Sequence, residues 1–391
     1  MYTVKTFNAI SDIIKEHLPE KEYNVSSNAG IYEAALVRSA NLHTEIFPPQ
    51  LLAIARAGAG YNNIPLEKCA EKGIVVFNTP GANANAVKEL VLCGLLLAGR
   101  QVVPAIQWLE SAYANGITGL GELAEKQKKY FVGPELAGKK LGVVGLGAIG
   151  VQVANAAANG LNMEVMGYDP YMSVEAAWHL TRSVRHAATL DEIFSECDYI
   201  TLHLPLTDKT RGMVDSLRFA AMKPGAVLLN FARGGLVNTD DLLEALATGR
   251  LARYVTDFPD DALVCKKNII TLPHLGASTP ESEENCAAMA AKQLADYLEH
   301  GDIVNSVNFP SCSMPRTGAW RLCILNRNVA GMVGKITAVL AAENHNIDNM
   351  LNKSRGDWAC TLIDTGTEPS PACLAALEAI DGVVKVRALG R

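Results

Sequence analysis

Residues 141–150 read LGVVGLGAIG and contain the spacing Gly145-x-Gly147-x-x-Gly150. An apolar run leads into this stretch, and a helix-like run, VQVANAAAN, follows it. A second apolar run, EVMGYD, then ends in Asp169, 19 residues after the last glycine. A strand, a glycine loop, a helix and a second strand that ends in an acid form the fingerprint of a dinucleotide-binding Rossmann unit.

Each residue of this fingerprint has a physical task. Gly145 permits the tight turn, Gly147 lets backbone N–H groups approach a pyrophosphate, and Gly150 lets the helix pack closely on the strand. The phosphates are expected at the N-terminus of that helix. Asp169 would accept hydrogen bonds from the adenosine ribose hydroxyls. A proline and a tyrosine follow it, with no basic group for a 2′-phosphate, so the sequence favours NAD over NADP.

The alternation of strand and helix continues on both sides of the glycine loop. Short apolar runs, among them YTVKTF, LLAIARAG, DYITLHL, AVLLNFA and NIITLPH, alternate with helical patterns through most of the first 300 residues. This rhythm predicts parallel sheets with helices on both faces. A polar stretch at roughly 112–139 is interpreted as a loose connection, and a long helix is expected over 281–300.

The last seventy or so residues follow a proline- and serine-containing linker and have a different order of elements. Their pattern predicts strand, helix, two strands, helix and strand. This βαββαβ order is that of the ferredoxin-like motif. With 391 residues, the chain is expected to hold two or three domains.

Composition excludes several classes of protein. The chain is 49% hydrophobic and 19% charged, which is typical of a soluble globular protein, and its net charge of −6 gives no field for nucleic acid or anionic lipid. The longest apolar run, 90–99, is about half a membrane span, and the first residues lack the order of a secretion signal. The nine cysteines include no CxxC pair, which predicts reduced thiols in a cytoplasmic protein and no metal site.

Polar or otherwise special residues follow the predicted strands, where a doubly wound sheet binds its ligand. In the central region these are Leu204, Ala232, Arg233, Asp257 and His274. In the first hundred residues they are Arg38, Arg56, Gly58, Ala59, Gly60 and Asn83. Arginines and a glycine-rich loop at strand ends suggest an anionic substrate held by guanidinium groups and backbone N–H donors.

The central residues suit the oxidation of an alcohol by a nicotinamide cofactor. Histidine, with an unperturbed pKa near 6.5, is suited to accept the hydroxyl proton near neutral pH, which makes His274 the candidate. The acidic run DFPDD at 257–261 could supply a carboxylate beside it. Arg233 is followed by two glycines, and its planar fork can bind the carboxylate of a 2-hydroxy acid in a bidentate manner.

These residues together resemble the D-2-hydroxyacid dehydrogenase family. GLGAIG with YDP, NFARGGLVNTDDL, LPHLGAST and the block RAGAGYNNIPLEKCAEKGIVVFNTP match its blocks in order, over residues 1 to about 310. The C-terminal βαββαβ segment resembles an ACT regulatory domain. The resemblance implies a Rossmann NAD domain at 95–285, inserted in a flavodoxin-like α/β substrate domain at 1–94 and 286–312, and an ACT-like domain at 319–391.

The resemblance also assigns roles to individual residues. It makes His274 the proton donor and acceptor and Arg233 the clamp on the substrate carboxylate. The family's catalytic glutamate is missing from the shorter loop here, so Asp261 is the first substitute and Asp260 the second. The matching cofactor residues are Gly145, Gly147, Ala148, Ile149, Gly150, Asp169, Leu204, Phe231, Ala232, Asp257, His274 and Gly276.

Within this family the resemblance is to members that carry an ACT-type domain and oxidise 3-phosphoglycerate, the step that begins serine synthesis. Arg38 and Arg56 would then bind the phosphate, with Gly58, Ala59, Gly60 and Asn83 near the substrate. One alternative is a dehydrogenase of another D-2-hydroxy acid, such as glycerate or lactate. Another is a non-catalytic protein on the same fold that senses NAD.

The ACT-like segment departs from the pattern of amino-acid-binding ACT domains. Those domains usually have Pro-Gly at the first strand–helix turn, and this one has Ala330-Gly331. Asn326, Asn328 and Asn346 could still bind serine across a subunit interface. The alternative is that the segment only joins subunits, and a homo-oligomer, either a dimer or a tetramer, is expected in both cases.

Overall fold

The computed structural model describes residues 1–390, and the chain divides into two compact units. Unit 1 is Met1–Asn83 with Pro280–Arg391, and unit 2 is Ala84–Thr279. The chain leaves unit 1 where helix α2 (Ala84–Gly99) begins and returns to it where helix α10 (Pro280–His300) begins. The boundaries expected at 94/95 and 285/286 lie inside these two helices. A continuous helix belongs to one body, so the chain passes from one unit to the other at the helix starts.

Unit 2 contains a parallel sheet with the strand order β12-β11-β10-β9-β6-β7-β8. This is the Rossmann order 3-2-1-4-5-6 with one added strand, which confirms the predicted fold. The central strands are almost wholly buried because helices cover both faces. The strands are β6 (Lys140–Val144), β7 (Glu164–Tyr168), β8 (Arg185–His186), β9 (Tyr199–Leu202), β10 (Ala226–Asn230), β11 (Leu251–Thr256) and β12 (Ile269–Thr271).

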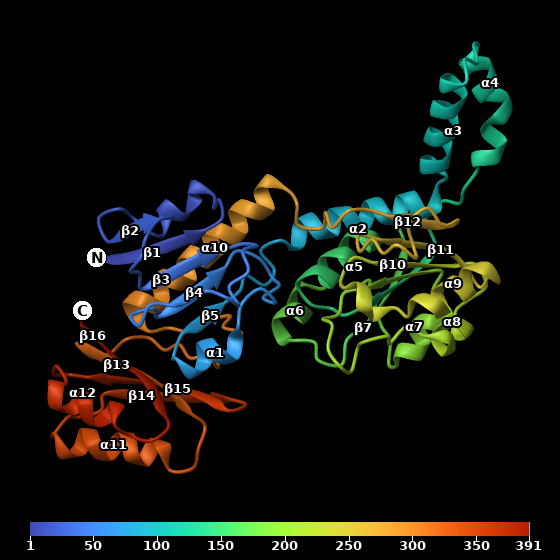
Figure 1. Ribbon diagram of the computed structural model, residues 1–391. Helices are drawn as coiled ribbons and strands as arrows, with labels where there is room; N and C mark the ends of the chain where they lie inside the picture. Colours follow the sequence, from blue (N-terminus) through green and yellow to red (C-terminus); the bar gives the residue numbers. More distant parts are fainter. Residues whose placement is uncertain (391) are drawn as a thin grey trace. The chain divides into compact units, whose positions relative to one another are not determined.

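Helices connect these strands, as the alternating pattern predicts. Besides α2 they are α5 (Ala148–Gly160), α6 (Val174–His179), α7 (Leu190–Glu196), α8 (Ser216–Ala221), α9 (Thr239–Ala247) and the 3₁₀ turn Gly234–Leu236. Figure 1 shows them packed against the sheet of unit 2. Their apolar side chains form cores on the two sides of the sheet, one around Phe194 and Leu228 and the other around Val153 and Leu229.

The interpretation of 112–139 as a loose connection is wrong. Helices α3 (Val102–Ala114) and α4 (Leu120–Gln127) and the 3₁₀ turn Lys128–Phe131 form a hairpin that extends away from the sheet of unit 2 (Figure 1). Ala112 is buried in α3, and α4 buries no residue, so these helices lack the one-sided apolar pattern by which a core-facing helix is recognised. We name this segment, residues 102–131, the arm.

Within residues 1–390, no single helix is long and apolar enough to cross a membrane. Helices α2 and α3 have the length and apolar composition of a membrane span only when they are taken together, and they are bent by 68° at the break between them.

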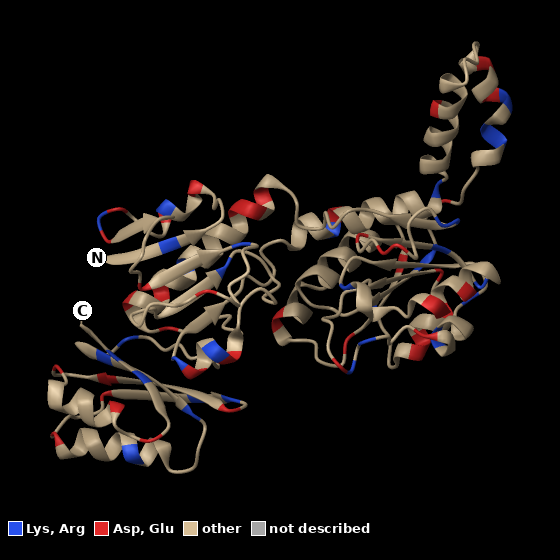
Figure 2. Ribbon diagram, viewed as in Figure 1, with Lys and Arg blue, Asp and Glu red and all other residues tan. Residues whose placement is uncertain are grey.

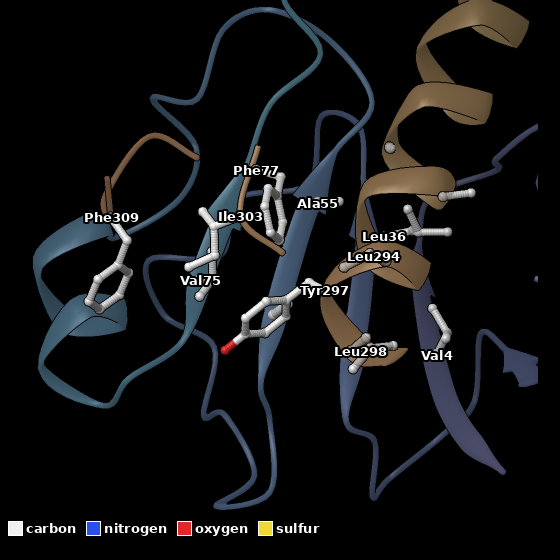
Figure 3. Close-up of a cluster of buried hydrophobic side chains, with 14 of the residues drawn as sticks. Val4, Leu36, Ala55, Val75, Phe77, Leu294, Tyr297, Leu298, Ile303 and Phe309 are labelled. Carbon is white, nitrogen blue, oxygen red and sulfur yellow. The ribbon is translucent and has the colours of Figure 1, made fainter. Parts of the chain in front are cut away.

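Unit 1 begins with a second parallel sheet, of strand order β2-β1-β3-β4-β5. This order is the flavodoxin-like one and confirms the predicted second α/β sheet. Its strands are β1 (Tyr2–Phe7), β2 (Tyr23–Ser26), β3 (Ala34–Val37), β4 (Ala53–Arg56) and β5 (Val75–Phe77), accompanied by α1 (Leu66–Glu71) and a 3₁₀ turn (Asp12–Glu16). Helix α10 lies across this sheet, with Leu294, Tyr297 and Leu298 in the same cluster as Val4, Leu36 and Ala55 (Figure 3).

The C-terminal part of unit 1, residues 319–390, has the predicted ferredoxin-like order and is called the C-terminal module below. Its antiparallel sheet has the order β14-β15-β13-β16. The elements are β13 (Trp320–Arg327), α11 (Met332–Ala342), β14 (Asn349–Arg355), β15 (Trp358–Thr365), α12 (Pro371–Glu378) and β16 (Val383–Gly390).

The two faces of the C-terminal sheet are both covered. Successive side chains of a strand point to opposite faces. Leu322 and Ile324 of β13 therefore pack with the helices α11 and α12, while Cys323 and Leu325 join the core that contains Phe77 of β5. The module thus shares a hydrophobic core with the first sheet of unit 1. Basic and acidic residues are interspersed along the ribbons of both units (Figure 2), as the small net charge suggests.

Candidate cofactor and substrate residues

The glycine loop between β6 and α5 has the geometry that its spacing predicts. Gly145 has φ +96°, and a Cβ there would lie 2.5 Å from the carbonyl oxygen of His203. A Cβ on Gly150 would overlap the carbonyl oxygen of Gly145, so the third glycine lets the helix approach the turn. Gly147 is the N-cap of α5, and a Cβ there would meet no protein atom within 4 Å. The loop is therefore open at the position where a phosphate would approach.

Asp169 directly follows β7 and supports the glycine loop. Its Oδ2 accepts a hydrogen bond from the backbone N–H of Leu146 at 2.8 Å, and its Oδ1 accepts one from Tyr171 N at 2.8 Å. A carboxylate oxygen has two lone pairs, so each oxygen can still accept a hydrogen bond from a ribose hydroxyl. The acid therefore both braces the loop and retains the acceptor capacity that its predicted role requires. Ala148 and Ile149 form the first turn of α5.

The exits of β9 and β10 carry the next predicted residues. Asn230 is fully buried at the end of β10, and its side-chain oxygen accepts hydrogen bonds from the backbone N–H groups of Ala232 and Arg233. This fixes the turn that exposes the Arg233 side chain, whose Nη1 donates to the carbonyl of Ala232 at 2.6 Å. Phe231 is buried against α2, and Leu204 follows β9 next to Gly145. Asn230 was not among the predicted residues, although it stands one position before them.

Asp257 and the loop 274–276 come together at the exits of β11 and β12. Asp257 is 1% exposed, and its Oδ2 accepts a hydrogen bond from Gly276 N at 3.0 Å. Its Oδ1 is buried and has no hydrogen-bond partner among residues 1–390. Burial raises the pKa of Asp257, while the Gly276 N–H and the charge on His274 oppose that rise. The His274 ring is exposed and meets the Phe258 ring edge-on at 4.7 Å.

Asp260 and Asp261, the expected replacements for the family's glutamate, both lie on an exposed turn. Asp260 uses its Oδ1 to accept a hydrogen bond from Ala262 N at 2.8 Å. Within the described chain, neither carboxylate lies within 4.0 Å of an imidazole nitrogen of His274. The carboxylate on which the charge of His274 acts is Asp257. The assignment of Asp261 to catalysis therefore stays a prediction.

In unit 1, the predicted substrate residues follow the neighbouring strands β3 and β4. Val37 pairs with Arg56, so Arg38 lies beside it, and Arg56 Nε donates to the carbonyl of Arg38 at 3.1 Å. Arg38 also pairs with Glu283 of α10, with 2.5 Å between Nη2 and Oε1. Nothing in the local sequence indicated Glu283, which is 245 positions away.

The glycine-rich loop after β4 is held by hydrogen bonds to the two residues that follow β5 by one and two positions. Gly58 has φ +149°, which favours glycine, and its N–H donates to Thr79 Oγ1 at 2.7 Å. The Asn78 side chain donates to the carbonyl of Ala59 at 2.7 Å, and Gly60 follows half-buried. The Oδ1 atom of Asn83 is buried and has no hydrogen-bond partner among the described residues.

The three asparagines predicted to bind an effector do not meet within one chain. Asn326 and Asn328 lie at the end of β13 that pairs with Trp358, and Asn328 donates to the carbonyl of Gly356. Asn346 precedes β14 at the opposite end of the sheet, where Asn349 pairs with Asp364. A ligand could contact all three only if two chains contributed.

Comparisons with known proteins identify the family. Residues 95–276 match the family described as D-isomer specific 2-hydroxyacid dehydrogenase, NAD binding domain. A D-3-phosphoglycerate dehydrogenase of Haemophilus influenzae is 31% identical over 353 residues, which are 87% of this chain and 82% of that protein. The chain belongs to the D-isomer specific 2-hydroxyacid dehydrogenase family.

Other relatives match the chain over only part of their own length. The D-3-phosphoglycerate dehydrogenase of Methanocaldococcus jannaschii is 36% identical over 293 residues, 73% of this chain and 52% of that protein. The human protein of that name is 36% identical over 300 residues, 74% and 53% of the two chains. The chain therefore spans about half the length of these relatives. A 3-phosphoglycerate dehydrogenase structure from Entamoeba histolytica with NAD+ bound matches with a TM-score of 0.61 and 26% identity, covering 78% and 98%.

Proposed function

We propose that the chain is an NAD-dependent D-3-phosphoglycerate dehydrogenase, which oxidises 3-phosphoglycerate to 3-phosphohydroxypyruvate and so begins L-serine synthesis. The observation that carries the choice of substrate is the pair Arg38 and Arg56. The two arginines follow adjacent parallel strands and stand beside a glycine loop with a positive φ. Guanidinium groups with nearby backbone N–H donors suit a phosphate. The names of several relatives support the same substrate.

The residues of unit 2 fit NAD. Gly147 leaves space for the pyrophosphate, Asp169 keeps lone pairs for the ribose, and Asp257 Oδ1 is a buried acceptor that a carboxamide N–H could satisfy. Leu204 adds apolar surface beside Gly145. When bound, NAD supplies the hydride acceptor for the oxidation of a secondary alcohol.

The chain's own residues would handle charge and proton. Arg233 would hold the substrate carboxylate, because its fork is exposed on a turn fixed by Asn230. An imidazole nitrogen of His274 would accept the proton from the hydroxyl oxygen as the hydride leaves the carbon that bears this hydroxyl, and the product is the ketone. The carboxylate beside this histidine would be Asp261, with Asp260 second, as the sequence predicts. Asp257, the buried carboxylate on which the charge of His274 acts, is a further candidate.

The test is NADH formation from 3-phosphoglycerate, compared with unphosphorylated D-glycerate and D-lactate, for the wild type and for Arg56→Gln. We expect a strong preference for the phosphorylated acid in the wild type. Loss of a charge-assisted hydrogen bond should raise the KM for 3-phosphoglycerate about ten- to hundredfold in the variant. The KM for D-glycerate serves as the control and should change little.

Each outcome of this comparison has a clear meaning. Equal activity on an unphosphorylated acid would leave the family role of His274 in place but would assign the chain to another D-2-hydroxy acid. A chain that binds NADH and oxidises none of the acids would support the NAD-sensing alternative.

We propose that the protein is a homo-oligomer and that the arm is its contact surface. Ile106, Leu109, Tyr113, Ile117 and Tyr130 are all more than 40% exposed on the arm. Exposed apolar side chains gathered on one segment are typical of interfaces, and full burial of an exposed apolar side chain contributes about 1.5–3 kcal/mol, of which a half-exposed one such as Leu109 would gain about half. We propose a cytoplasmic location because all nine cysteines are free thiols.

Analytical ultracentrifugation of the wild type and of Ile106→Glu tests the oligomer. We expect the charged variant to sediment as a smaller species, because the glutamate would have to be desolvated in the contact. The same runs with millimolar serine test the effector, since Asn346 and Asn326 can share a ligand only across two chains. Unchanged sedimentation of the variant would exclude the arm, and unchanged sedimentation and thermal stability with serine would exclude that effector.

A further inference from the structure

Two buried arginines of the C-terminal module meet the end of helix α10. The last carbonyls of a helix have no partner within the helix. Arg387 of β16 donates from Nη1 to Tyr297 O at 2.9 Å and from Nη2 to Leu298 O at 2.6 Å. Arg321 of β13 donates from Nη1 to His300 O at 3.2 Å. Both arginines therefore cap the C-terminal turn of a helix that belongs to the first part of unit 1.

The two arginines differ in how their charge is balanced. Arg321 is fully buried and forms a bidentate pair with Asp364, at 2.6 and 3.0 Å. Arg387 is 9% exposed, and no carboxylate of residues 1–390 lies within 4.0 Å of its guanidinium. Its charge meets carbonyl oxygens at the negative end of α10 and the Tyr297 ring, whose centre is 4.8 Å away. A buried cation is costly without such partners, so Arg387 and the helix end depend on each other.

The other end of α10 contacts a proposed substrate residue. Glu283, in the first turn of the helix, forms the ion pair with Arg38 described above. Between its ends the helix packs Leu294, Tyr297 and Leu298 onto the first sheet (Figure 3). The helix has 21 residues, and a helix of that length is a stiff element of about 30 Å. A change at the cap can therefore shift or loosen the turn that carries Glu283.

We propose that Arg387 is a positioning residue for substrate binding. It fixes the C-terminal end of α10, and through this helix it sets the place of Glu283 and hence of the Arg38 guanidinium. The C-terminal module is then a structural part of the phosphate-binding half of the enzyme. This inference rests on the proposed function, because it assumes that Arg38 binds the phosphate of the substrate.

The test compares Arg387→Met with a matched variant, Arg355→Met. Methionine keeps an apolar stem and removes the donors to α10. Arg355 is an exposed arginine of the same module, and it donates to the carbonyl of Ser306, outside α10. We expect Arg387→Met to raise the KM for 3-phosphoglycerate severalfold, while kcat and the Kd for NADH change less than twofold. Arg355→Met should leave all three unchanged. A KM that stays at the wild-type value, or an equal rise in both variants, would overturn the proposal.

Two milder variants cover the case in which Arg387→Met does not fold. Arg387→Lys keeps the charge and should recover most of the wild-type KM. Tyr2→Phe removes a different donor to the same carbonyl, Leu298 O, and should raise the KM slightly. The variant Arg38→Gln, which removes the guanidinium itself, serves as the reference. If Arg387→Lys folds and raises the KM as much as Arg38→Gln does, positioning through the cap is contradicted.

Hydrogen exchange separates this inference from the proposed function. In Arg387→Met, amides in the first turns of α10 should exchange faster than in the wild type, whether or not the chain oxidises 3-phosphoglycerate. Unchanged exchange around Glu283 would refute transmission along the helix. If exchange around Glu283 is faster in the variant but the wild type does not oxidise 3-phosphoglycerate, the assignment of the substrate is overturned. The coupling between Arg387 and Glu283 then remains in place.

Discussion

His274→Ala should lower the turnover of 3-phosphoglycerate by about a hundred- to ten-thousandfold, because a positioned general acid–base group contributes that much to catalysis. The binding of NADH should remain nearly unchanged. The cofactor residues Gly147 and Asp169 lie on the first strand–helix–strand unit of the Rossmann sheet and do not depend on the imidazole. The His274 ring is exposed and contacts Phe258, so its loss leaves no buried polar group without a partner.

Stopped-flow or steady-state NADH formation gives the turnover, and fluorescence titration gives the Kd for NADH. His186→Ala is a suitable control, because His186 is an exposed histidine on the edge strand β8 of the same unit. This control should behave as the wild type. Turnover of His274→Ala within a few-fold of the wild type would show that another group moves the proton.

The carboxylate beside His274 is the part of the site that the sequence predicts least well. The resemblance selects Asp261, since the loop here is shorter than the family's and contains no glutamate. In the structure the Asp261 side chain is exposed, whereas Asp257 is buried where the loop 274–276 folds over it. Spacing along a loop does not determine which carboxylate points inward, because that depends on the turn that Asp260 makes with Ala262.

The sheets were predictable because burial imposes a pattern on their strands. Strands such as β6 and β10 are buried on both faces, and continuous apolar runs reveal them. The arm was not predictable in this way, since its helices bury almost nothing within the chain. The two-residue strand β8 is too short to show a period.

The pattern of apolar and polar residues along the sequence also does not predict contacts between residues that are distant in sequence. Arg38 was predicted from its position after a strand, but its partner Glu283 lies on a helix 245 positions later. The caps from Arg321 and Arg387 onto α10 depend on the packing of one folded segment against another. The alternating pattern of β13 and β16 indicates strands, but it does not show that these arginines are buried.

Gly150→Ala should weaken NADH binding by about a hundredfold or more, because a loss of the close approach between α5 and its turn removes several phosphate hydrogen bonds at once. A Cβ at this position would overlap the carbonyl oxygen of Gly145, which is backbone and cannot rotate away. The turn and the helix N-terminus must therefore separate.

Two other glycines of the same segment make this prediction specific. A Cβ on Gly160, at the end of α5, meets no protein atom within 4 Å, so Gly160→Ala should bind NADH as the wild type does and unfold at the same or a slightly higher temperature. Gly147→Ala also meets no protein atom, and it should keep its thermal stability yet lose affinity for NADH. We expect Gly150→Ala to lose both affinity for NADH and thermal stability, Gly147→Ala to lose affinity alone, and Gly160→Ala to lose neither. This pattern would place the pyrophosphate at the open side of the loop. Wild-type affinity in Gly147→Ala would contradict that placement, since a methyl group there can only be felt by a bound ligand.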